Sequence, residues 1–474
     1  MKFHFANIGP IRQAELELGD LTIIAGRNNT GKTYVVYTLY GFLMGWRDTL
    51  IERNYFRFEA EGPVEKNLPG SVIDIEEVGI KLMEDEQYQC QVSSQELHRE
   101  RQVLASWVAK DFSSGQIHTI FSSSPDNFKN ATLEVIFNTD FPANPGTLNI
   151  EHGRDTVISI RYDHGNLIFS TNQVGKIHPR QALALIASAY MLFLLGNLES
   201  LPAPFILSAE RFGISLFYKE LDFTKNRLVE FLQNMENEKV KEPFPLAMFM
   251  DKNASRYALP IKHNIDYTRN IADSVNEKSA LEDKKLHDDV KNIMDGYYKS
   301  DKDSIRFVSK ARKNARFDIP LHLASSSARG LSDLYFYLRH KAEPNQLLII
   351  DEPESHLDTK NQINLARILS HFIHAGIKVL ITTHSDYVLK EINNLVMLSN
   401  SFPGKKQFVS KHKYKENEFL RPEELRCYVA QQGQLTSCSI DKFGVDMPVF
   451  DETIDEINKI SNELANRLTH AENE

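Results

Sequence analysis

The feature that most constrains the fold is a glycine-bounded octapeptide that fits the pattern G-x-x-x-x-G-K-[ST] at every position. A short apolar run with strand character, residues 21–25, precedes it, and an apolar run with helical character, residues 34–44, follows it. In this setting the two glycines let the turn wrap so tightly that backbone N–H groups point at α- and β-phosphates. The octapeptide consists of Gly26, Arg27, Asn28, Asn29, Thr30, Gly31, Lys32 and Thr33.

This octapeptide predicts a binding site for a nucleoside triphosphate. We expect Lys32 to reach the β- and γ-phosphates and Thr33 to offer its hydroxyl to Mg²⁺. The N-terminus of the following helix adds the positive end of its dipole beside the phosphates.

A pair of carboxylates far along the chain is the second chemical anchor. Leu347 to Ile350 are four apolar residues, which predict a strand buried on both faces of a parallel sheet. Asp351 and Glu352 follow at the carboxyl end, where open α/β sheets bind their ligands. We expect Asp351 to reach Mg²⁺, directly or through water, and Glu352 to polarise the attacking water. An isolated Asp-Glu pair would be an ordinary acidic turn, but the glycine-bounded pattern about 320 residues upstream favours the functional interpretation.

The residues after this pair predict a second strand at the same site. Residues 363–373 carry apolar side chains at helical spacing and end near Gly376, and residues 378–383 form another apolar strand pattern. Strand, helix and strand in this order predict a right-handed βαβ unit, which brings His384 to the same sheet end as Glu352. A single His is usually structural, but at this position contact with the γ-phosphate is favoured.

The rest of the chain divides by its patterns. Residues 1–20 alternate as a β-hairpin, and together with residues up to 45 they join residues 320–400 as a split nucleotide-binding core. Residues 46–175 carry short alternating runs and are expected to form a β-rich insertion. Residues 176–319 are expected to be mainly helical, and residues 401–474 to complete the domain and end in an amphipathic helix.

Smaller expectations accompany these divisions. Residues 264–299 are rich in charge and predict an exposed helical pair. Two strands are expected at residues 304–309 and 314–323, and a helix at residues 331–340, with the preceding serines as capping hydroxyls.

Composition excludes several classes of protein. The chain has 474 residues with a formal net charge of −9, so bulk electrostatics give no reason to expect non-specific binding to DNA or acidic membranes. Its three cysteines, Cys90, Cys427 and Cys438, form no metal or disulfide pattern, which fits a reducing cytoplasm. No leader pattern begins the chain, and the most apolar stretch, residues 182–195, is shorter than the roughly 20 residues a membrane span needs. We expect a soluble cytoplasmic protein without a membrane partner.

Together these segments resemble the ATP-binding-cassette class of ATPases, in the branch of the structural-maintenance-of-chromosomes, Rad50 and RecF proteins. Residues 26–33 match Walker A, and residues 347–352 match Walker B. Residues 355–358 resemble the D-loop, and His384 resembles the switch histidine. Residues 325–328 stand where this class carries its signature motif, but they lack the glycine pair of the Leu-Ser-Gly-Gly-Gln pattern.

Two runs narrow the resemblance. Residues 353–358 and 383–389 are similar to the overcoming-lysogenization-defect ATPases and to the ATPase subunits of the Septu and PARIS antiphage systems. Those ATPases carry a globular insertion, and no heptad stretch of coiled-coil length is present here. The strong match covers residues 1–45 and 320–395. Overcoming-lysogenization-defect nucleases also carry a Toprim domain with an Asp-x-Asp pair, and residues 401–474 contain no such pair.

The resemblance implies a fold, a function and partners. It implies an α/β fold, an ABC-type nucleotide-binding domain with a largely parallel core sheet and an N-terminal β-subdomain, interrupted by a β and then helical insertion. It implies slow hydrolysis of ATP with Mg²⁺ by a homodimer or larger ring, in which Ser326, Ser327 and Asp358 complete the partner's site. The implied role is an antiphage sensor or scaffold that controls a separate nuclease or toxin effector, triggered by DNA or a phage protein.

Two other functions are weighed against this one. The main alternative is a DNA-repair ATPase of the RecF kind that binds DNA directly; a transporter cassette is disfavoured by the large internal insertion. If DNA is contacted, two basic clusters are expected to carry the contact, although a solubilising surface is the stronger interpretation of both because neither has interleaved aromatic residues. The clusters are Lys310, Arg312 and Lys313, and Lys405, Lys406, Lys411, Lys413 and Lys415.

Overall fold

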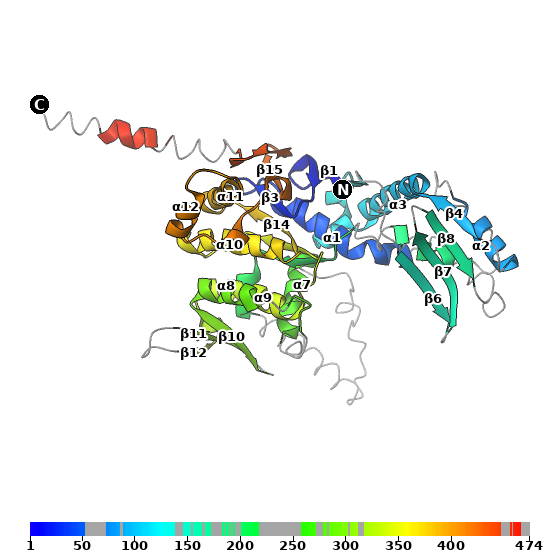
Figure 1. Cartoon of the computed structure of the whole chain (residues 1–474), viewed down its shortest axis with the longest axis horizontal. Helices are drawn as coiled ribbons and strands as arrows, with labels where there is room; N and C mark the ends of the chain where they lie inside the picture. The colour runs from blue at the N-terminus through cyan, green and yellow to red at the C-terminus, as the bar shows by residue number, and fades with distance from the viewer. Residues whose placement is uncertain are drawn as a thin grey trace, which may run out of the picture.

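The structure is a computed structural model of the whole chain (Figure 1). It describes residues 1–52, 73–85, 89–137, 146–152, 155–163, 166–171, 201–217, 257–271, 278–281, 284–301, 304–310 and 317–446, with single residues and short runs between 183 and 194 and between 456 and 465.

A nine-stranded sheet forms the centre of the molecule, in the order β5-β1-β2-β16-β15-β3-β14-β13-β9. From β15 to β9 all neighbouring strands are parallel, whereas β5, β1 and β2 pair in antiparallel register. The α/β fold with a parallel core and an N-terminal antiparallel part is therefore confirmed. The strands are β1 (Lys2–Ile8), β2 (Ile11–Glu17), β3 (Leu21–Ala25), β5 (Thr132–Ile136), β9 (Pro204–Leu207), β13 (Leu347–Asp351), β14 (Lys378–Thr383), β15 (Leu425–Gln431) and β16 (Gln434–Ser437).

Helices cover both faces of this sheet, and the central strands are buried on both sides. In β13, Leu347 and Ile349 belong to one apolar cluster, and Leu348 and Ile350 belong to the other. The first cluster includes residues of α1 (Lys32–Glu52) and α3 (Ser94–Gly115). The second includes residues of α9 (Ser326–His340), α10 (Thr359–His374) and α11 (Asp386–Ser399). Alternate side chains of one strand therefore serve two cores, as the uninterrupted apolar run predicts.

Residues 46–175 contain long helix as well as strand. Helix α3 spans 22 residues; a capping box of Ser93 and Glu96 opens it, and it buries Leu97, Leu104 and Phe112. The Ser-x-x-Glu spacing and the apolar period of 3.6 both specify this helix, so the β-rich expectation is wrong for residues 94–115. The remainder includes α2 (Ile75–Glu84), α4 (Ile117–Ile120) and a four-stranded sheet of β4 (Cys90–Ser93), β6 (Gly146–His152), β7 (Asp155–Asp163) and β8 (Asn166–Thr171).

Part of this segment belongs to the central sheet. Strand β5 pairs along β1, with Phe5 opposite Leu133. The antiparallel edge of the sheet therefore combines β1 and β2 from the N-terminus with β5, which lies more than 110 residues further along the chain.

Two helices and a small sheet occupy the described part of residues 257–320. The helices are α7 (Leu259–Asn270) and α8 (Lys284–Met294), and the sheet is formed by β10 (Gly296–Asp301), β11 (Ser304–Ser309) and β12 (Asp318–Pro320). The helical pair expected over residues 264–299 thus ends in a strand from Gly296. The strand expected over residues 314–323 is confined to 318–320, because a 3₁₀ turn follows at 321–323. Arg312 and Lys313 lie outside the described residues.

The C-terminal region adds strands β15 and β16 between β2 and β3. It also supplies α12 (Lys405–His412) and a short hairpin of β17 (Ile440–Asp441) and β18 (Gly444–Val445). Residues 458–465 are helical, as the amphipathic pattern predicts. Across the described residues, none of the helices combines the length and apolar character that a membrane span requires.

Candidate nucleotide-binding site

The octapeptide of residues 26–33 forms a tight turn between β3 and α1, and backbone geometry requires glycine at its first and sixth positions. Gly26 and Gly31 have φ values of 151° and 95°. A Cβ atom on Gly26 would lie 2.6 Å from the carbonyl oxygen of Ala430, and one on Gly31 would lie 2.7 Å from Ile11. Side chains at these two positions would therefore collide with neighbouring strands and open the turn.

Lys32 lies inside the loop that it closes. Its Nζ donates hydrogen bonds of 2.9 Å to the carbonyl oxygens of Gly26 and Arg27. Burial lowers the pKa of Lys32, and the nearby carboxylates of Glu352 and Asp351 oppose this effect. The ammonium is thus held over the loop without a carboxylate hydrogen-bond partner among the described contacts, which suits it to an incoming phosphate. Arg27, Asn28 and Asn29 are exposed at the rim, and Thr30 closes the turn by donating to the Arg27 carbonyl.

The structure brings Thr33 and Asp351 together across 318 residues of sequence. The Thr33 hydroxyl donates to Asp351 Oδ2 over 3.2 Å, and Thr382 donates to Oδ1 of the same carboxylate. Asp351 is buried, and burial raises its pKa to about 6, with Glu352 and Glu210 adding to the increase. A buried carboxylate beside a hydroxyl at a phosphate loop gains from a cation, because positive charge offsets the cost of its ionisation.

Glu352 occupies the turn that follows β13. Its φ of 48° is unusual for a residue with a side chain, and its N–H donates to Thr382 Oγ1 over 2.9 Å. Ser355 donates to Glu352 Oε2 over 3.1 Å, which orients the carboxylate. The left-handed backbone therefore turns this partly exposed side chain out of the strand direction, at the end of the sheet where the phosphate loop lies.

His384 follows β14 and faces the same group of carboxylates. Its Nδ1 lies 4.0 Å from Glu352 Oε1 and 3.3 Å from Glu354 Oε1, and its backbone N–H donates to Glu354 over 2.9 Å. Glu354 is almost fully buried and also accepts a hydrogen bond of 2.7 Å from Thr383. The expected convergence of His384 and Glu352 at one sheet end is thus observed, and Glu354 joins their two loops.

Arg211 holds the backbone of the acidic turn in place, and the sequence patterns did not identify it. Its guanidinium is fully buried and donates to the carbonyl oxygens of Asp351 over 2.7 Å and Glu352 over 2.8 Å. It also donates to Ser208 and, over 3.3 Å, to Gly330 in α9. Burial lowers its pKa, and the carboxylates around it oppose the decrease. One side chain therefore ties the turn after β9, the acidic turn after β13, and helix α9.

Ser326, Ser327 and Asp358 lie at the beginnings of two helices. Ser325 caps α9 by accepting from the Ala328 N–H, Ser327 contacts the Ser325 hydroxyl, and Arg329 donates to Ser326. Asp358 caps α10 by accepting from two backbone N–H groups and from the Asn361 side chain. The capping role expected for the serine run is confirmed, although α9 begins at Ser326 instead of Leu331. Within the described chain, no hydrogen bond joins these three residues to the phosphate loop.

Thr382 and Glu354 were also missed by the sequence patterns. The signal for Thr382 was present, since Thr382 and Thr383 are polar residues at the end of an apolar strand. Across the described part of the chain, no group of three or more His, Cys, Asp or Glu side chains could hold a metal ion. A Mg²⁺ site with one hydroxyl and one carboxylate still fits, because this ion takes few protein ligands and completes its shell with phosphate oxygens and water.

The fold and the site define a P-loop nucleotide-binding protein of the α/β class. A profile of the AAA ATPase domain family (AAA_15) matches residues 1–389, which include the phosphate loop, the acidic pair and His384. The chain belongs to this family. No curated protein matches the sequence.

Several solved structures align along most of the chain. The SMC head domain from Thermotoga maritima is 12% identical, with a TM-score of 0.29 over 93% of this chain and 98% of that one. The Smc head domain of Pyrococcus furiosus bound to the C-terminal domain of ScpA is 11% identical, with a TM-score of 0.31 over 97% and 98%. The recombination mediator protein RecF is 12% identical, with a TM-score of 0.30 over 92% and 97%. The family assignment therefore rests on the profile match and on the site, and not on these structures.

Proposed function

We propose that this chain binds ATP with Mg²⁺ and hydrolyses it slowly. The observation that carries the proposal is the 3.2 Å hydrogen bond between Thr33 and Asp351, which joins the phosphate loop to the acidic strand end. Two residues so far apart in the sequence meet where a metal ion could bridge the loop and a phosphate.

Each residue of the site has a role in this proposal. Lys32 would hold the β- and γ-phosphates, and Thr33 and Asp351 would hold Mg²⁺, which supplies positive charge to the phosphate oxygens when bound. Glu352 would accept a proton from the attacking water, with Ser355 fixing its carboxylate. His384 would contact the γ-phosphate, while Glu354 holds its loop in place. Loop positions 27–30 would surround the phosphates with backbone N–H groups.

We further propose that the complete catalytic unit is a dimer, alone or within a larger ring. Ser326, Ser327 and Asp358 stand at helix N-termini, which favour negative charge, and their side-chain hydrogen bonds within the described chain are local. They would complete the phosphate site of a second copy.

The finer role follows from the resemblance of residues 353–358 and 383–389 to antiphage ATPases. In the cytoplasm, the protein would sense infection and hold or release a separate nuclease or toxin effector. A RecF-like ATPase that binds DNA directly is the second candidate, favoured by the exposed lysines at 406, 411, 413 and 415.

The tests of these proposals separate them. Phosphate release by the purified protein should require Mg²⁺ and disappear in Lys32→Ala; activity that is retained in this variant would exclude the assigned site. Capture of the native protein should then recover a nuclease or toxin in the presence of ATP. Recovery of DNA with no such protein would favour the RecF-like candidate instead.

A further inference from the structure

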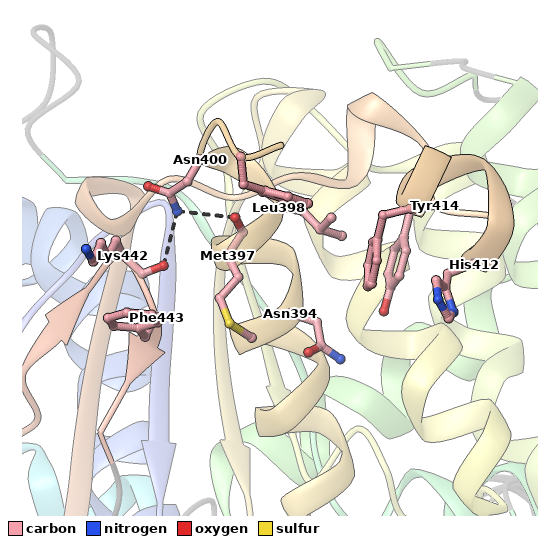
Figure 2. Close-up of a pocket in the computed structure, with 10 residues that line it drawn as sticks. Asn394, Met397, Leu398, Asn400, His412, Tyr414, Lys442 and Phe443 are labelled. Atoms are coloured by element: carbon pink, nitrogen blue, oxygen red, sulfur yellow. Dashed lines mark hydrogen bonds between the residues drawn. The ribbon is translucent and has the colours of Figure 1, made fainter. Parts of the chain in front are cut away.

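An apolar groove opens on the surface far along α11 from the nucleotide site, between α12 and the β17–β18 hairpin (Figure 2). Its volume is about 550 Å³. Four large apolar side chains in its lining are between 36% and 62% exposed, an unusual concentration for a surface with no function. We call it the C-terminal groove; these four residues are Met397, Phe402, Phe408 and Phe443.

Hydrogen bonds hold the walls of the C-terminal groove in place. Asn393 donates to the Val445 carbonyl over 3.0 Å and accepts from its N–H over 2.8 Å, which fixes the hairpin against α11. Asn400 bridges the end of α11 to the Lys442 carbonyl over 3.1 Å, as Figure 2 shows. On the opposite wall, the rings of Phe402 and Phe408 pack edge to face. The groove is therefore formed before anything binds, which lowers the entropic cost of occupying it.

The rim of the groove is basic. Lys442 belongs to its lining, and the exposed Lys411 lies three residues after Phe408 on α12, so these two residues share one face of that helix. An occupant that fits both the floor and the rim must carry an apolar stripe and acidic residues beside it.

The last 28 residues of this chain have that composition. Residues 447–474 contain seven Asp or Glu and two Lys or Arg, a net charge of −5. Apolar side chains recur at helical spacing, at Ile454, Ile457, Ile460, Leu464 and Leu468. In the described helix, residues 458–465, Ile460 is 53% exposed and Leu464 is 56% exposed, so its apolar face is not covered. An acidic helix with an uncovered stripe and a basic groove with an uncovered floor are complementary.

The connection between the two is short enough for docking within one chain. The described body ends at Asp446, three residues after Phe443 in the groove wall. The residues from Asp446 to Ile460 can span up to about 45 Å, at roughly 3.3 Å per residue. A tether of this length gives an effective concentration in the millimolar range, so even weak contacts fill the groove.

We infer that the C-terminal helix docks in the C-terminal groove of its own chain, with Ile460 and Leu464 on the apolar floor. Its acidic residues then face Lys411 and Lys442. The Lys405–Lys415 cluster, considered above as a DNA contact, acts in part as the rim of this internal docking site. DNA is a poorer occupant, because an apolar floor offers nothing to a phosphate backbone.

Hydrogen–deuterium exchange on the full chain tests this inference. Leu464→Asp places a charge on the apolar stripe, and Asn462→Asp places the same charge on the opposite face of the helix as a matched control. Backbone amides of residues 397–412 should exchange roughly tenfold faster in Leu464→Asp, since a buried Leu is worth at least that factor, and should be unchanged in Asn462→Asp. Equal exchange in wild type and both variants would overturn docking.

A disulfide experiment identifies which copy supplies the helix. Phe443→Cys with Leu464→Cys should form a disulfide under mild oxidation, because docking brings their Cα atoms within the roughly 4–7 Å that the bond needs. Phe443→Cys with Asn462→Cys is the control and should form it at least tenfold more slowly. A product of monomer mass supports docking within one chain, whereas a covalent dimer assigns the groove to a second copy and overturns the proposal. If DNA slows exchange over residues 397–412 equally in wild type and Leu464→Asp, the groove is a DNA contact and the proposal also fails.

Discussion

The two halves of the proposed ATPase site are built in different ways. On the nucleotide side, Thr33, Asp351 and Thr382 come from three separate elements, and both threonine hydroxyls donate to the buried Asp351 carboxylate. On the helix side, within the described chain, the side chains of Ser326, Ser327 and Asp358 hydrogen-bond to residues at the beginning of their own helices. The hydrogen bonds of the first group depend on the tertiary fold, whereas those of the second group are made within single helices.

The fold of a single chain therefore positions the nucleotide side, whereas the helix side is proposed to act on the nucleotide of a second copy. A buried network spreads the effect of any change, because each missing partner leaves another polar group unpaired. A capping residue can be changed with little effect beyond its own helix. Substitutions on the nucleotide side should therefore affect stability and turnover together, and those on the helix side should affect mainly turnover.

The largest effect is expected for Glu352→Gln. The variant keeps the size of the side chain but removes the proton acceptor, so ATP turnover should fall by roughly 10²–10⁴-fold. Binding of ATP should persist, because the phosphate loop is intact. Phosphate release and filter binding of labelled ATP measure the two effects. Glu423→Gln, at an exposed carboxylate, is the control, and turnover at the wild-type rate in Glu352→Gln would remove Glu352 from its role.

Arg211→Met tests the buried side of the comparison. The substitution keeps an elongated apolar side chain but leaves the carbonyl groups of Ser208, Asp351 and Glu352 without this donor. The free energy of unfolding should fall by about 3 kcal/mol. Denaturant titration measures it. Arg306→Met, which breaks an exposed pair with Asp318, should change stability by no more than about 0.5 kcal/mol.

Arg211→Lys adds a functional readout to this test. A single ammonium cannot reach carbonyl groups on three elements as the guanidinium does, so turnover should fall even where the variant stays folded. If Arg211→Lys keeps full turnover and Arg211→Met keeps full stability, the arginine does not position the acidic turn.

The sequence predicted the residues whose chemistry follows from local spacing. The phosphate loop, the acidic pair and His384 each end an apolar run, and a sheet with parallel neighbours brings such ends together. Arg211 could not be found in this way, because its partners Asp351 and Glu352 lie 140 and 141 residues away. Nothing in the spacing around Arg211 distinguishes a buried guanidinium from an exposed one.

Helix α3 shows a different failure. Its capping box and apolar spacing are present in residues 93–112, but the short alternating runs elsewhere in residues 46–175 favoured a β-rich interpretation of the whole segment. The signal was local and readable, unlike that of Arg211. Tertiary contacts define the buried network, whereas the local capping box and apolar spacing define the helix.

The buried carboxyl of Asp333 should make the stability of the fold depend on pH. This carboxyl is fully buried in α9, and burial raises its pKa to about 7, against hydrogen bonds from Ser332 and Thr268 and the charge of Arg211, which lower it. A raised folded-state pKa stabilises the fold most below the unfolded value near 4, and this contribution is lost as pH rises through about 7. The free energy of unfolding should decrease by about 2 kcal/mol between pH 5 and 8 relative to Asp333→Asn. Denaturant titrations at several pH values measure the difference, and parallel pH profiles in the two proteins would contradict it.

The smallest effect on stability is expected on the helix side, at Asp358. Asp358→Ala removes the cap of α10 and should lower stability by about 1 kcal/mol, whereas Asp358→Asn, which can still accept at a helix N-terminus, should retain it. Thermal unfolding of the two variants measures how much the capping hydrogen bonds of α10 contribute to stability. The loss should remain well below that of Arg211→Met, and an equal loss would show that the two sides are built alike.

Mixing Lys32→Ala with Asp358→Ala, each of which we expect to turn over little ATP alone, then decides whether Asp358 acts on a second copy. Lys32→Ala lacks a working phosphate loop but keeps Asp358, and Asp358→Ala has the opposite defect. If Asp358 completes the partner's site, a mixed dimer contains one intact site, and an equal mixture should recover roughly a quarter of wild-type turnover. If Asp358 acts on the nucleotide of its own chain, every site carries one defect and no activity returns. Steady-state phosphate release from the mixture, after exchange of subunits, measures the recovery, and its absence in a demonstrated mixed dimer would place both halves of the site in one chain.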